Sequence, residues 1–238
     1  TTINLATSLA AVKKNVLIVD ADPQGNASTG LGLSYNERKP SIYEMIHEKK
    51  LLKEGIKETL IPGLKIIGAN TDLAAAEVEL INFENREFVF KSIFSELNGF
   101  DFIFVDCPPA LGLLTINSLV ASNTTLIPLQ CEYYSLEGIS SLINTINTLK
   151  NKNLTNNRVF GIIRTMVDMR NNLAKEVSEE LEKHFPALVF NTLIPRNVKL
   201  AEAPSHGTSA IQYMPSSFGA KAYLALAGEL IRRIEGGR

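Results

Sequence analysis

The residues Asn15-Val16-Leu17-Ile18-Val19-Asp20-Ala21-Asp22-Pro23-Gln24-Gly25-Asn26 carry the strongest indication of the fold. Their apolar run Val16–Val19 has no polar interruption, which is typical of a strand buried on both faces of a parallel sheet. Asp20 and Asp22 follow this run, and the Pro-Gln-Gly-Asn sequence after them must turn the chain. Because ligands of open α/β sheets bind beyond the carboxyl ends of strands, both carboxylates are predicted to lie at a ligand-binding edge. The alternative is that Asp22 only caps the turn.

A second stretch, Phe100-Asp101-Phe102-Ile103-Phe104-Val105-Asp106-Cys107-Pro108-Pro109, is organised in the same way. An almost wholly apolar strand ends in Asp106, and the two prolines force a rigid exit from it. Asp22 after the first strand and Asp106 after the second indicate one edge that binds a metal ion and phosphate groups. The alternative for Asp106 is a carboxylate satisfied by turn amides.

The composition is that of an ordinary globular domain. The chain has 238 residues, a formal net charge of −1 and no tryptophan. No apolar run approaches the roughly 18 residues of a membrane span, and no linker is evident, so residues 1–238 are expected to form one domain. Basic residues are in excess only in the C-terminal half, so any contact with a polyanion is predicted to be a local patch there. Cys107 and Cys131 are expected to be buried free thiols in a reducing cytoplasm.

Strand and helix patterns alternate along the whole chain. Further strands are expected at 64–68, 124–130, 160–167 and 188–194, and helices at 1–14, 113–121, 135–150, 172–185 and 218–234. This alternation predicts an α/β fold with a doubly wound, mostly parallel sheet and helices on both faces. The helix at 1–14 resembles the back half of a βαβ unit, so the domain is expected to be truncated at its N-terminus. A lost N-terminal signal also stays open, because the first residue is Thr1.

Four groups of residues, in order and well spaced over essentially the whole chain, resemble the ParA/Soj partition ATPases, which are relatives of MinD. They are Ile3–Ala6 together with Val16–Asn26, then Val105–Pro109, Glu132–Gly138 and Ile194–Ser205. The Asp-x-Asp-Pro-Gln-Gly-Asn sequence and the Pro-Arg-Asn-Val-Lys-Leu-Ala-Glu-Ala-Pro-Ser sequence are the most specific of these motifs. The chain is therefore identified as a member of that family.

The resemblance implies a P-loop NTPase-like fold and an ATP-dependent switch that uses Mg²⁺. Two subunits would sandwich two ATP molecules, and this homodimer would bind DNA without sequence specificity. A ParB-type partner would then stimulate hydrolysis and release the dimer, so that chromosomes or plasmids are segregated. Such a protein would work in the cytoplasm in association with the nucleoid, with no membrane partner.

The resemblance also implies roles for single residues. Asp22 corresponds to the acid that orients the attacking water, and Asp106 to the acid that holds Mg²⁺ through water. Pro195, Arg196 and Asn197 match the turn that borders the adenine, although Asn197 could instead be a plain helix cap. The chemistry agrees with these roles, because phosphoryl transfer needs positioning and neutralised charge. Mg²⁺ also takes few carboxylates and keeps several of its waters.

The sequence departs from the family pattern in two places. The glycine-rich phosphate loop and the strand that leads into it should come before Thr1, so residues 1–238 alone are not expected to hydrolyse ATP. Phe218 occupies a position at which many relatives carry an arginine implicated in DNA contact. Lys199 matches the other basic position, and Lys199 and the nearby Lys221 are therefore the predicted DNA contacts.

Three alternatives remain. A MinD-like, membrane-associated positioning ATPase and an iron–sulfur carrier ATPase belong to the same superfamily. The carrier would present cysteines at the dimer face, whereas Cys107 and Cys131 form no C-x-x-C pair. The third alternative is a DNA-binding remnant without enzymatic activity, which would require that the gene itself begins at Thr1.

Overall fold

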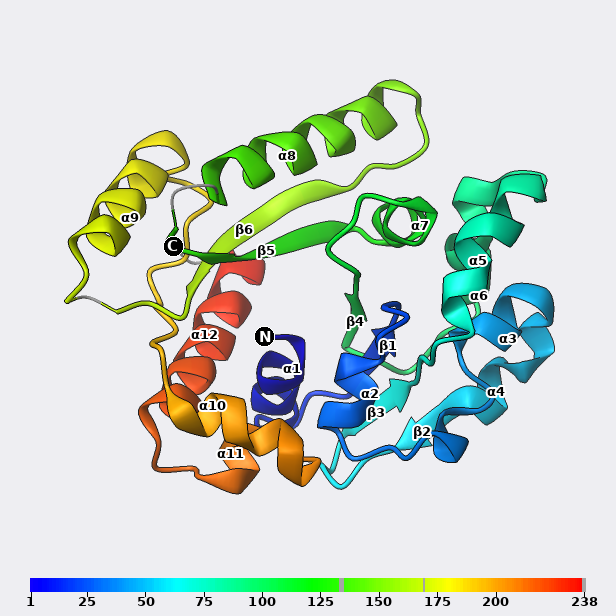
Figure 1. Cartoon of the computed structure of the whole chain (residues 1–238), viewed down its shortest axis with the longest axis horizontal. Coiled ribbons are helices and arrows are strands. Elements are labelled where there is room, and N and C mark those ends of the chain that lie inside the picture. The colour runs from blue at the N-terminus through cyan, green and yellow to red at the C-terminus, as the bar shows by residue number, and fades with distance from the viewer. Residues whose placement is uncertain (133–134, 169, 237–238) are drawn as a thin grey trace.

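The computed structural model describes residues 1–132, 135–168 and 170–236, in which helices flank two β-sheets (Figure 1). In the larger sheet β1 (Val16–Asp20) lies between β3 (Leu64–Ile67) and β4 (Phe102–Asp106), and these three strands are parallel. The edge strand β2 (Ile56–Glu58) pairs with β3 in the antiparallel direction. This arrangement confirms the predicted α/β fold class with mostly parallel strands.

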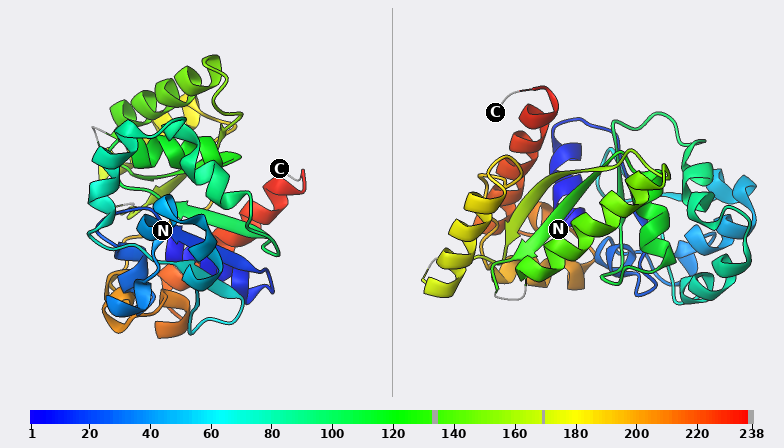
Figure 2. Two further views of the ribbon diagram at one scale, coloured as in Figure 1. Left: turned by 90° about the vertical axis from the view of Figure 1, so that its right-hand side faces the viewer. Right: turned by 90° about the horizontal axis from the view of Figure 1, so that it is seen from above.

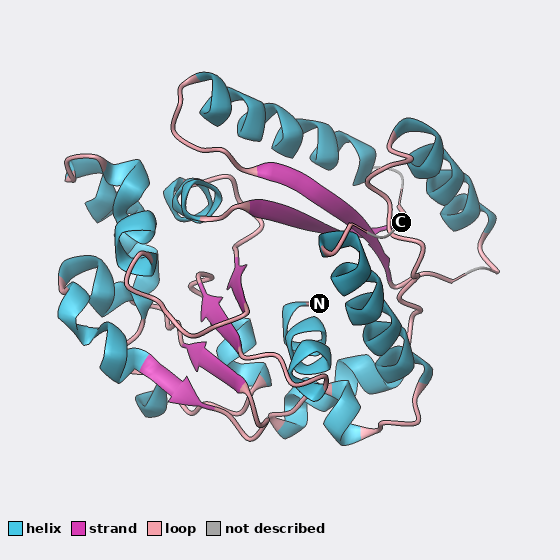
Figure 3. Ribbon diagram, turned by 180° about the vertical axis from the view of Figure 1, so that it is seen from behind, coloured by secondary structure: helices cyan, strands magenta, loops and turns pink. Residues whose placement is uncertain are grey.

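The smaller sheet consists of β5 (Thr124–Gln130) and β6 (Arg158–Thr165), which are parallel (Figure 3). The sequence predicted a single sheet, whereas the ladders found in the described part of the chain form a four-stranded and a two-stranded group. One apolar cluster nevertheless joins the two groups. Phe104 of β4, Leu126 of β5 and Ile163 of β6 all belong to it.

Helices cover both faces of the sheets (Figures 1 and 2). Their bounds are α1 (Thr2–Ala11), α2 (Asn26–Gly30), α3 (Ile42–His47), α4 (Leu52–Gly55), α5 (Leu73–Glu79), α6 (Val89–Phe94), α7 (Leu113–Ala121), α8 (Ser135–Asn151), α9 (Asn172–His184), α10 (Val198–Glu202), α11 (Ala210–Tyr213) and α12 (Phe218–Ile234). Helices α1 and α12 pack against each other on one side, and α3, α5, α6 and α7 pack together on the other. Within the described residues, none of these helices has the length and apolar character needed to cross a membrane.

Strand β1 is buried over its whole length because its side chains alternate between two cores. Val16 and Ile18 pack into the cluster that contains α1 and α12 side chains. Leu17 and Val19 point to the opposite face, into the cluster built from α3, α5, α6 and α7. An uninterrupted apolar run is therefore required at this place in the sheet, which is why the sequence pattern identifies the strand.

The predicted strand over 188–194 does not form as one continuous strand. Two isolated bridges hold this part of the chain. Val189 pairs with Ile162 of β6, and Pro195, which follows the segment, pairs with Val167, which follows β6. Between the two bridges, the amides of Asn191 and Thr192 bond instead to the carboxylate of Glu229 on α12. The side chain of Glu229 thus replaces the neighbouring strand as the hydrogen-bond acceptor, and no sequence pattern within 188–194 reveals this.

Candidate functional site

The carboxyl ends of β1 and β4 bring the two acidic motifs to one edge of the sheet. Asp20 and Asp106 are register partners at the last positions of these parallel strands. The N–H of Ala21 donates to the carbonyl oxygen of Asp106 at 2.8 Å, which continues the pairing one residue further. Asp22 follows in the turn beyond β1, where the sequence analysis expects it.

Asp20 is fully buried and organises the turn that carries Asp22. One of its carboxylate oxygens accepts hydrogen bonds from the backbone N–H and the hydroxyl of Ser28, at 2.8 and 2.7 Å. The other accepts from the N–H of Asp22 at 3.3 Å. Burial raises the pKa of Asp20 to about 6 against the opposing effect of the Ser28 hydrogen bonds, and the charge of Asp106 adds to the rise.

Asp22 is half-buried, and its Oδ1 accepts the N–H of Gln24 at 2.9 Å. This is the turn-capping contact that the simpler interpretation of Asp22 predicts, and it uses one carboxylate oxygen. The turn closes at Gly25, which adopts a φ of 63°. A Cβ on Gly25 would lie 2.7 Å from the carbonyl oxygen of Ala69, so the turn requires glycine both for its backbone angle and for this close approach.

The carboxylate of Asp106 is half-buried and accepts a hydrogen bond from the hydroxyl of Thr2 at the start of α1. The first turn of α1 therefore lies against the same sheet edge as the acidic motifs. Sequence reasoning did not single out Thr2 or Ser28 as members of this edge. No short motif contains both partners of either contact, since Thr2 and Asp106 are 104 positions apart and Ser28 and Asp20 are eight apart.

Only one of the two cysteines is buried, so the prediction for Cys107 is wrong. Cys131 is buried, whereas Cys107 is exposed. Cys107 lies one residue beyond the last position of β4, where the following Pro108-Pro109 sequence takes the chain out of the sheet. No group of three or more His, Cys, Asp or Glu side chains suited to a metal ion occurs among the residues that the structure describes.

A cavity of about 240 Å³ lies at the carboxyl ends of β5 and β6. Its lining residues are Gln130, Cys131, Glu132, Met166, Asp168, Asn171, Ala174 and Arg196. The acidic residues at the ends of β1 and β4 do not line this cavity. The structure therefore has two separate features at the carboxyl ends of its parallel strands, an acidic edge and a cavity.

The turn Pro195–Asn197 contributes to this cavity through Arg196. Pro195 forms a bridge with Val167, and the N–H of Arg196 donates to the carbonyl oxygen of Val167 at 3.1 Å. The side chain of Asn197 accepts the N–H of Lys199 at 3.0 Å and caps α10. The structure thus gives Asn197 the helix-cap role that the sequence left open, and it places Arg196 in the lining of the cavity.

Lys199, a predicted DNA contact, is engaged within the protein. Its Nζ forms an ion pair with Oε2 of Glu202 at 2.8 Å and lies 5.7 Å from the centre of the Tyr213 ring. The hydroxyl of Tyr213 donates to the same carboxylate at 3.2 Å. The Lys199 hydrogen bond leads the factors that lower the pKa of Glu202, so the two side chains stay charged and paired near neutral pH.

The other predicted DNA contact, Lys221, is exposed on the first turns of α12. Phe218 begins this helix and is 78% exposed, an unusual position for an aromatic side chain. Helices α10 and α12 are in contact, because Leu200 packs close to Gly219. Lys199 and Lys221 therefore extend from neighbouring elements. Tyr133 and Tyr134 of the third family motif lie outside the described residues.

Comparisons with known proteins find relatives that match nearly the whole chain. Residues 1–160 match the family described as AAA domain. Sporulation initiation inhibitor protein Soj of Bacillus subtilis is 45% identical over 231 residues, which cover 97% of this chain and 91% of that protein. Chromosome partitioning protein ParA of Myxococcus xanthus is 45% identical over 234 residues, which cover 98% of this chain and 83% of that protein.

Solved structures agree in fold. Cobyrinic acid a,c-diamide synthase from Mycobacterium smegmatis, with bound ATP analog and magnesium, has a TM-score of 0.83 at 29% identity, over 99% of this chain and 89% of that one. The cell division ATPase MinD of Pyrococcus furiosus has a TM-score of 0.76 at 22% identity, over 98% of this chain and 92% of that one, which shows a common fold. From its motifs, its fold and its relatives, the chain belongs to the ParA/Soj family of chromosome-partitioning ATPases.

Proposed function

We propose that this protein is an ATP-dependent switch for DNA partition. It binds ATP with Mg²⁺, dimerises, binds DNA without sequence specificity, and hydrolyses ATP when a ParB-type partner stimulates it. The observation that carries the proposal is the meeting of Asp20, Asp22 and Asp106 at the carboxyl edge of β1 and β4. Its place of action is the cytoplasm, in association with the nucleoid.

The residues at this edge fit a magnesium ion. Mg²⁺ prefers oxygen ligands, uses one or two carboxylates and retains several waters. Asp106 and the hydroxyl of Thr2 form such an oxygen donor set, and Asp106 would hold the ion through water. When bound with ATP, Mg²⁺ neutralises the charge that develops on the phosphates.

Asp22 is suited to hold a water in position. The N–H of Gln24 donates to one carboxylate oxygen of Asp22 and so fixes the orientation of that side chain. The buried hydrogen bonds between Asp20 and Ser28 fix the turn that carries it. The second oxygen of Asp22 accepts no hydrogen bond within the described part of the chain, so it can accept one from a water. Asp22 then orients that water, which is the main task left to a side chain in phosphoryl transfer.

The base of the nucleotide is assigned to the turn Pro195–Asn197. Arg196 lines the cavity at the ends of β5 and β6, and its planar, charged group can stack on a base. Pro195 and Asn197 shape the turn through the Val167 bridge and the α10 cap. Sites for small ligands are typically concave and lined by a few convergent polar groups, as this cavity is.

DNA is assigned to a basic patch formed by Lys199 and Lys221. Non-specific DNA binding depends on lysine and arginine side chains that replace counterions at the phosphates. The Lys199–Glu202 pair is half-exposed, and an exposed pair of this kind is weak enough for a phosphate to compete for the lysine. Each subunit carries both lysines, so dimerisation doubles their number.

The test compares Asp22→Ala with Asp106→Ala in ATP binding and ATP turnover, in protein that includes the phosphate loop expected before Thr1 and with DNA and the ParB-type partner present. Asp22→Ala should bind ATP and dimerise but lose nearly all turnover, because it acts on the water. Asp106→Ala should weaken the Mg²⁺-dependent binding itself. Glu58→Gln on the edge strand β2 is the control and should behave as wild type.

Equal failure of both variants to bind ATP would show that Asp22 and Asp106 do not have separate roles. Wild-type protein that binds no ATP, or that binds lipid vesicles and not DNA in the presence of ATP, would refute the partition function itself. The vesicle result would favour the MinD-like alternative.

A further inference from the structure

Two residues of the segment beside β6 leave the sheet ladder. Phe190 N–H donates to the carbonyl oxygen of Ile162 at 2.9 Å, and Ile194 N–H donates to that of Arg164 at 2.9 Å. Between these ladder bonds, Asn191 and Thr192 turn their amides away from β6. Asn191 is exposed and Thr192 is half-buried, yet both N–H groups bond to an acceptor within the protein and not to β6.

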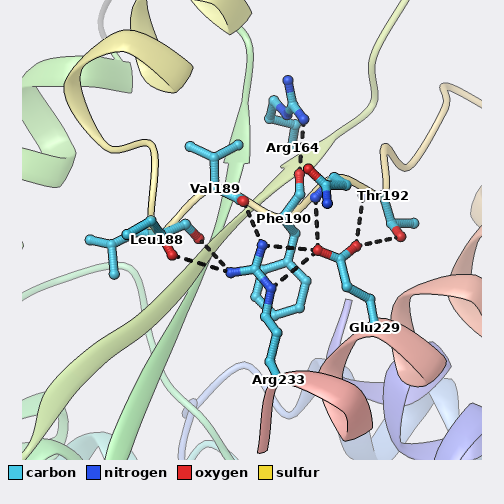
Figure 4. Close-up of polar contacts among 9 residues, drawn as sticks. Arg164, Leu188, Val189, Phe190, Thr192, Glu229 and Arg233 are labelled. Atoms are coloured by element: carbon cyan, nitrogen blue, oxygen red, sulfur yellow. Dashed lines mark hydrogen bonds and ion pairs between the residues drawn. The ribbon is translucent and has the colours of Figure 1, made fainter. Parts of the chain in front are cut away.

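Glu229 on α12 supplies the acceptors, as Figure 4 shows. Its Oε1 accepts the N–H of Asn191 at 2.8 Å, and its Oε2 accepts the N–H and the hydroxyl of Thr192 at 2.8 and 2.7 Å. The residue is only 5% exposed. Burial opposes the charge on Glu229, but the hydrogen bonds outweigh it and hold the pKa of this carboxyl below its usual range.

Arg233, one turn further along α12, completes the contact. Its Nη2 bonds to Oε1 of Glu229 at 2.9 Å and to the carbonyl oxygen of Val189 at 2.6 Å. Its guanidinium also lies 4.0 Å from the centre of the Phe190 ring (Figure 4). Glu229 therefore accepts hydrogen bonds from backbone N–H groups of the segment Val189–Thr192, and Arg233 donates one to a backbone carbonyl oxygen of the same segment.

The opposite side of Phe190 is held by β6. Its carbonyl oxygen accepts Nη2 of the buried Arg164 at 2.8 Å. Its ring lies so close to Gly161 that a Cβ there would come within 2.2 Å of a ring carbon. A shift of one residue would remove Phe190 from this contact and Asn191 and Thr192 from Glu229. The register of the segment along β6 is thus fixed from both sides.

The same register places the turn that lines the cavity. Beyond Thr192, Ile194 accepts the N–H of Val167 at 3.0 Å, and Arg196 donates to Val167 at 3.1 Å. Arg196 is only four positions beyond Thr192. An error in register or a loosened segment at Thr192 would therefore displace the side chain of Arg196 in the cavity.

We propose that Glu229, supported by Arg233, is a positioning residue that places Arg196 for recognition of the nucleotide base. Neither side chain of this pair lines the cavity, so the pair acts through the segment Val189–Pro195. The inference rests on the proposed function, because it takes the base to lie at the Pro195–Asn197 turn. It adds that base selectivity depends on a buried carboxylate in the C-terminal helix.

The test measures binding of fluorescent ATP and GTP analogues to the full protein. Glu229→Gln keeps the shape of the side chain but turns an amide NH₂ toward one of the backbone N–H groups. ATP affinity should fall about tenfold, which corresponds to one charged hydrogen bond. The ratio of ATP to GTP affinity should fall as well, while turnover of saturated enzyme changes little. A general loss of folded protein would lower both affinities equally and leave the ratio unchanged.

Two controls change side chains that do not bond to the segment Val189–Pro195. Arg232→Gln alters the exposed neighbour of Arg233 on α12, and Glu180→Gln alters a carboxylate on α9 that pairs with Lys183 and His184. Both should keep the wild-type ATP-to-GTP ratio. If Glu229→Gln does not fold, Thr192→Val removes only one donor to Glu229, and it should lower the ratio in the same direction.

The outcomes separate the two proposals. Wild-type protein that binds neither analogue would refute the nucleotide function and this inference with it. Selective wild-type binding with an unchanged ratio in folded Glu229→Gln, or in Thr192→Val if the first variant is unfolded, would refute the inference alone.

Discussion

Asp20 on β1 and Asp106 on β4 are register partners at the carboxyl ends of adjacent parallel strands, yet the two carboxylates have different surroundings. Asp20 is sealed from solvent and bonded to Ser28, whereas Asp106 is half-buried and bonded to Thr2. The first therefore supports the turn that carries Asp22, and the second is the one that solvent can reach.

The buried carboxyl of Asp20 makes stability depend on pH. Its pKa is 3.8 in an ordinary setting and about 6 here, so the folded protein binds more protons than the unfolded chain between these values. The free energy of unfolding should therefore fall as pH rises through this window, by up to about 3 kcal/mol. Asp20→Asn should flatten this dependence in urea denaturation. Asp101→Asn, which changes an exposed aspartate, should retain it, and a flat wild-type profile would contradict the prediction.

Gly25→Ala should destabilise the turn more than Gly99→Ala. Both glycines have positive φ, at 63° and 84°, so each substitution places alanine in a left-handed conformation at a cost of about 1–2 kcal/mol. A Cβ at Gly99 meets nothing, whereas at Gly25 it meets the carbonyl oxygen of Ala69. Thermal unfolding of the two variants isolates this second cost. Equal losses would mean that the turn relaxes freely around the added methyl group.

Glu202→Gln should strengthen DNA binding by freeing Lys199. An exposed ion pair is weak, so the gain should reach at most about fivefold at low salt. Glu58→Gln breaks a similar exposed pair with Lys65 on β2 and β3 and should leave DNA binding unchanged. Filter binding with ATP provides the measurement. Lys199→Glu should nearly remove binding, and full binding by Lys199→Glu would place the DNA surface elsewhere.

Phe218→Arg should make DNA binding more sensitive to salt. The logarithm of affinity falls with the logarithm of salt concentration by about 0.9 per neutralised phosphate, so a dimer that uses both new arginines should steepen the slope by about two. Phe218 is 78% exposed, which leaves room for the longer side chain. Val78→Arg on α5, another exposed apolar position, is the control. An unchanged slope in Phe218→Arg would show that the start of α12 does not touch DNA.

The amino-acid sequence alone identifies the strands β1 and β4, the acids that follow them and the family of the chain. These features are local, because a strand buried on both faces needs an unbroken apolar run, and a turn beyond it needs Gly25. The motif around Pro195–Asn197 was equally visible, since consecutive residues form the turn. Local patterns also indicated α12, whose apolar spacing matches its packing on α1.

The burial of Asp20 and the contacts that hold the segment before Pro195 are visible only in the folded protein. Asp20 and Asp106 look alike in sequence, and burial by Ser28 and its surroundings separates them. The segment over 188–194 has the composition of a strand, but Glu229 draws its amides out of the ladder from 37 and 38 positions away. Such contacts depend on how elements distant in the sequence pack together. Packing overrides the local preference of a short segment, because each backbone amide bonds to the acceptor that the fold places beside it.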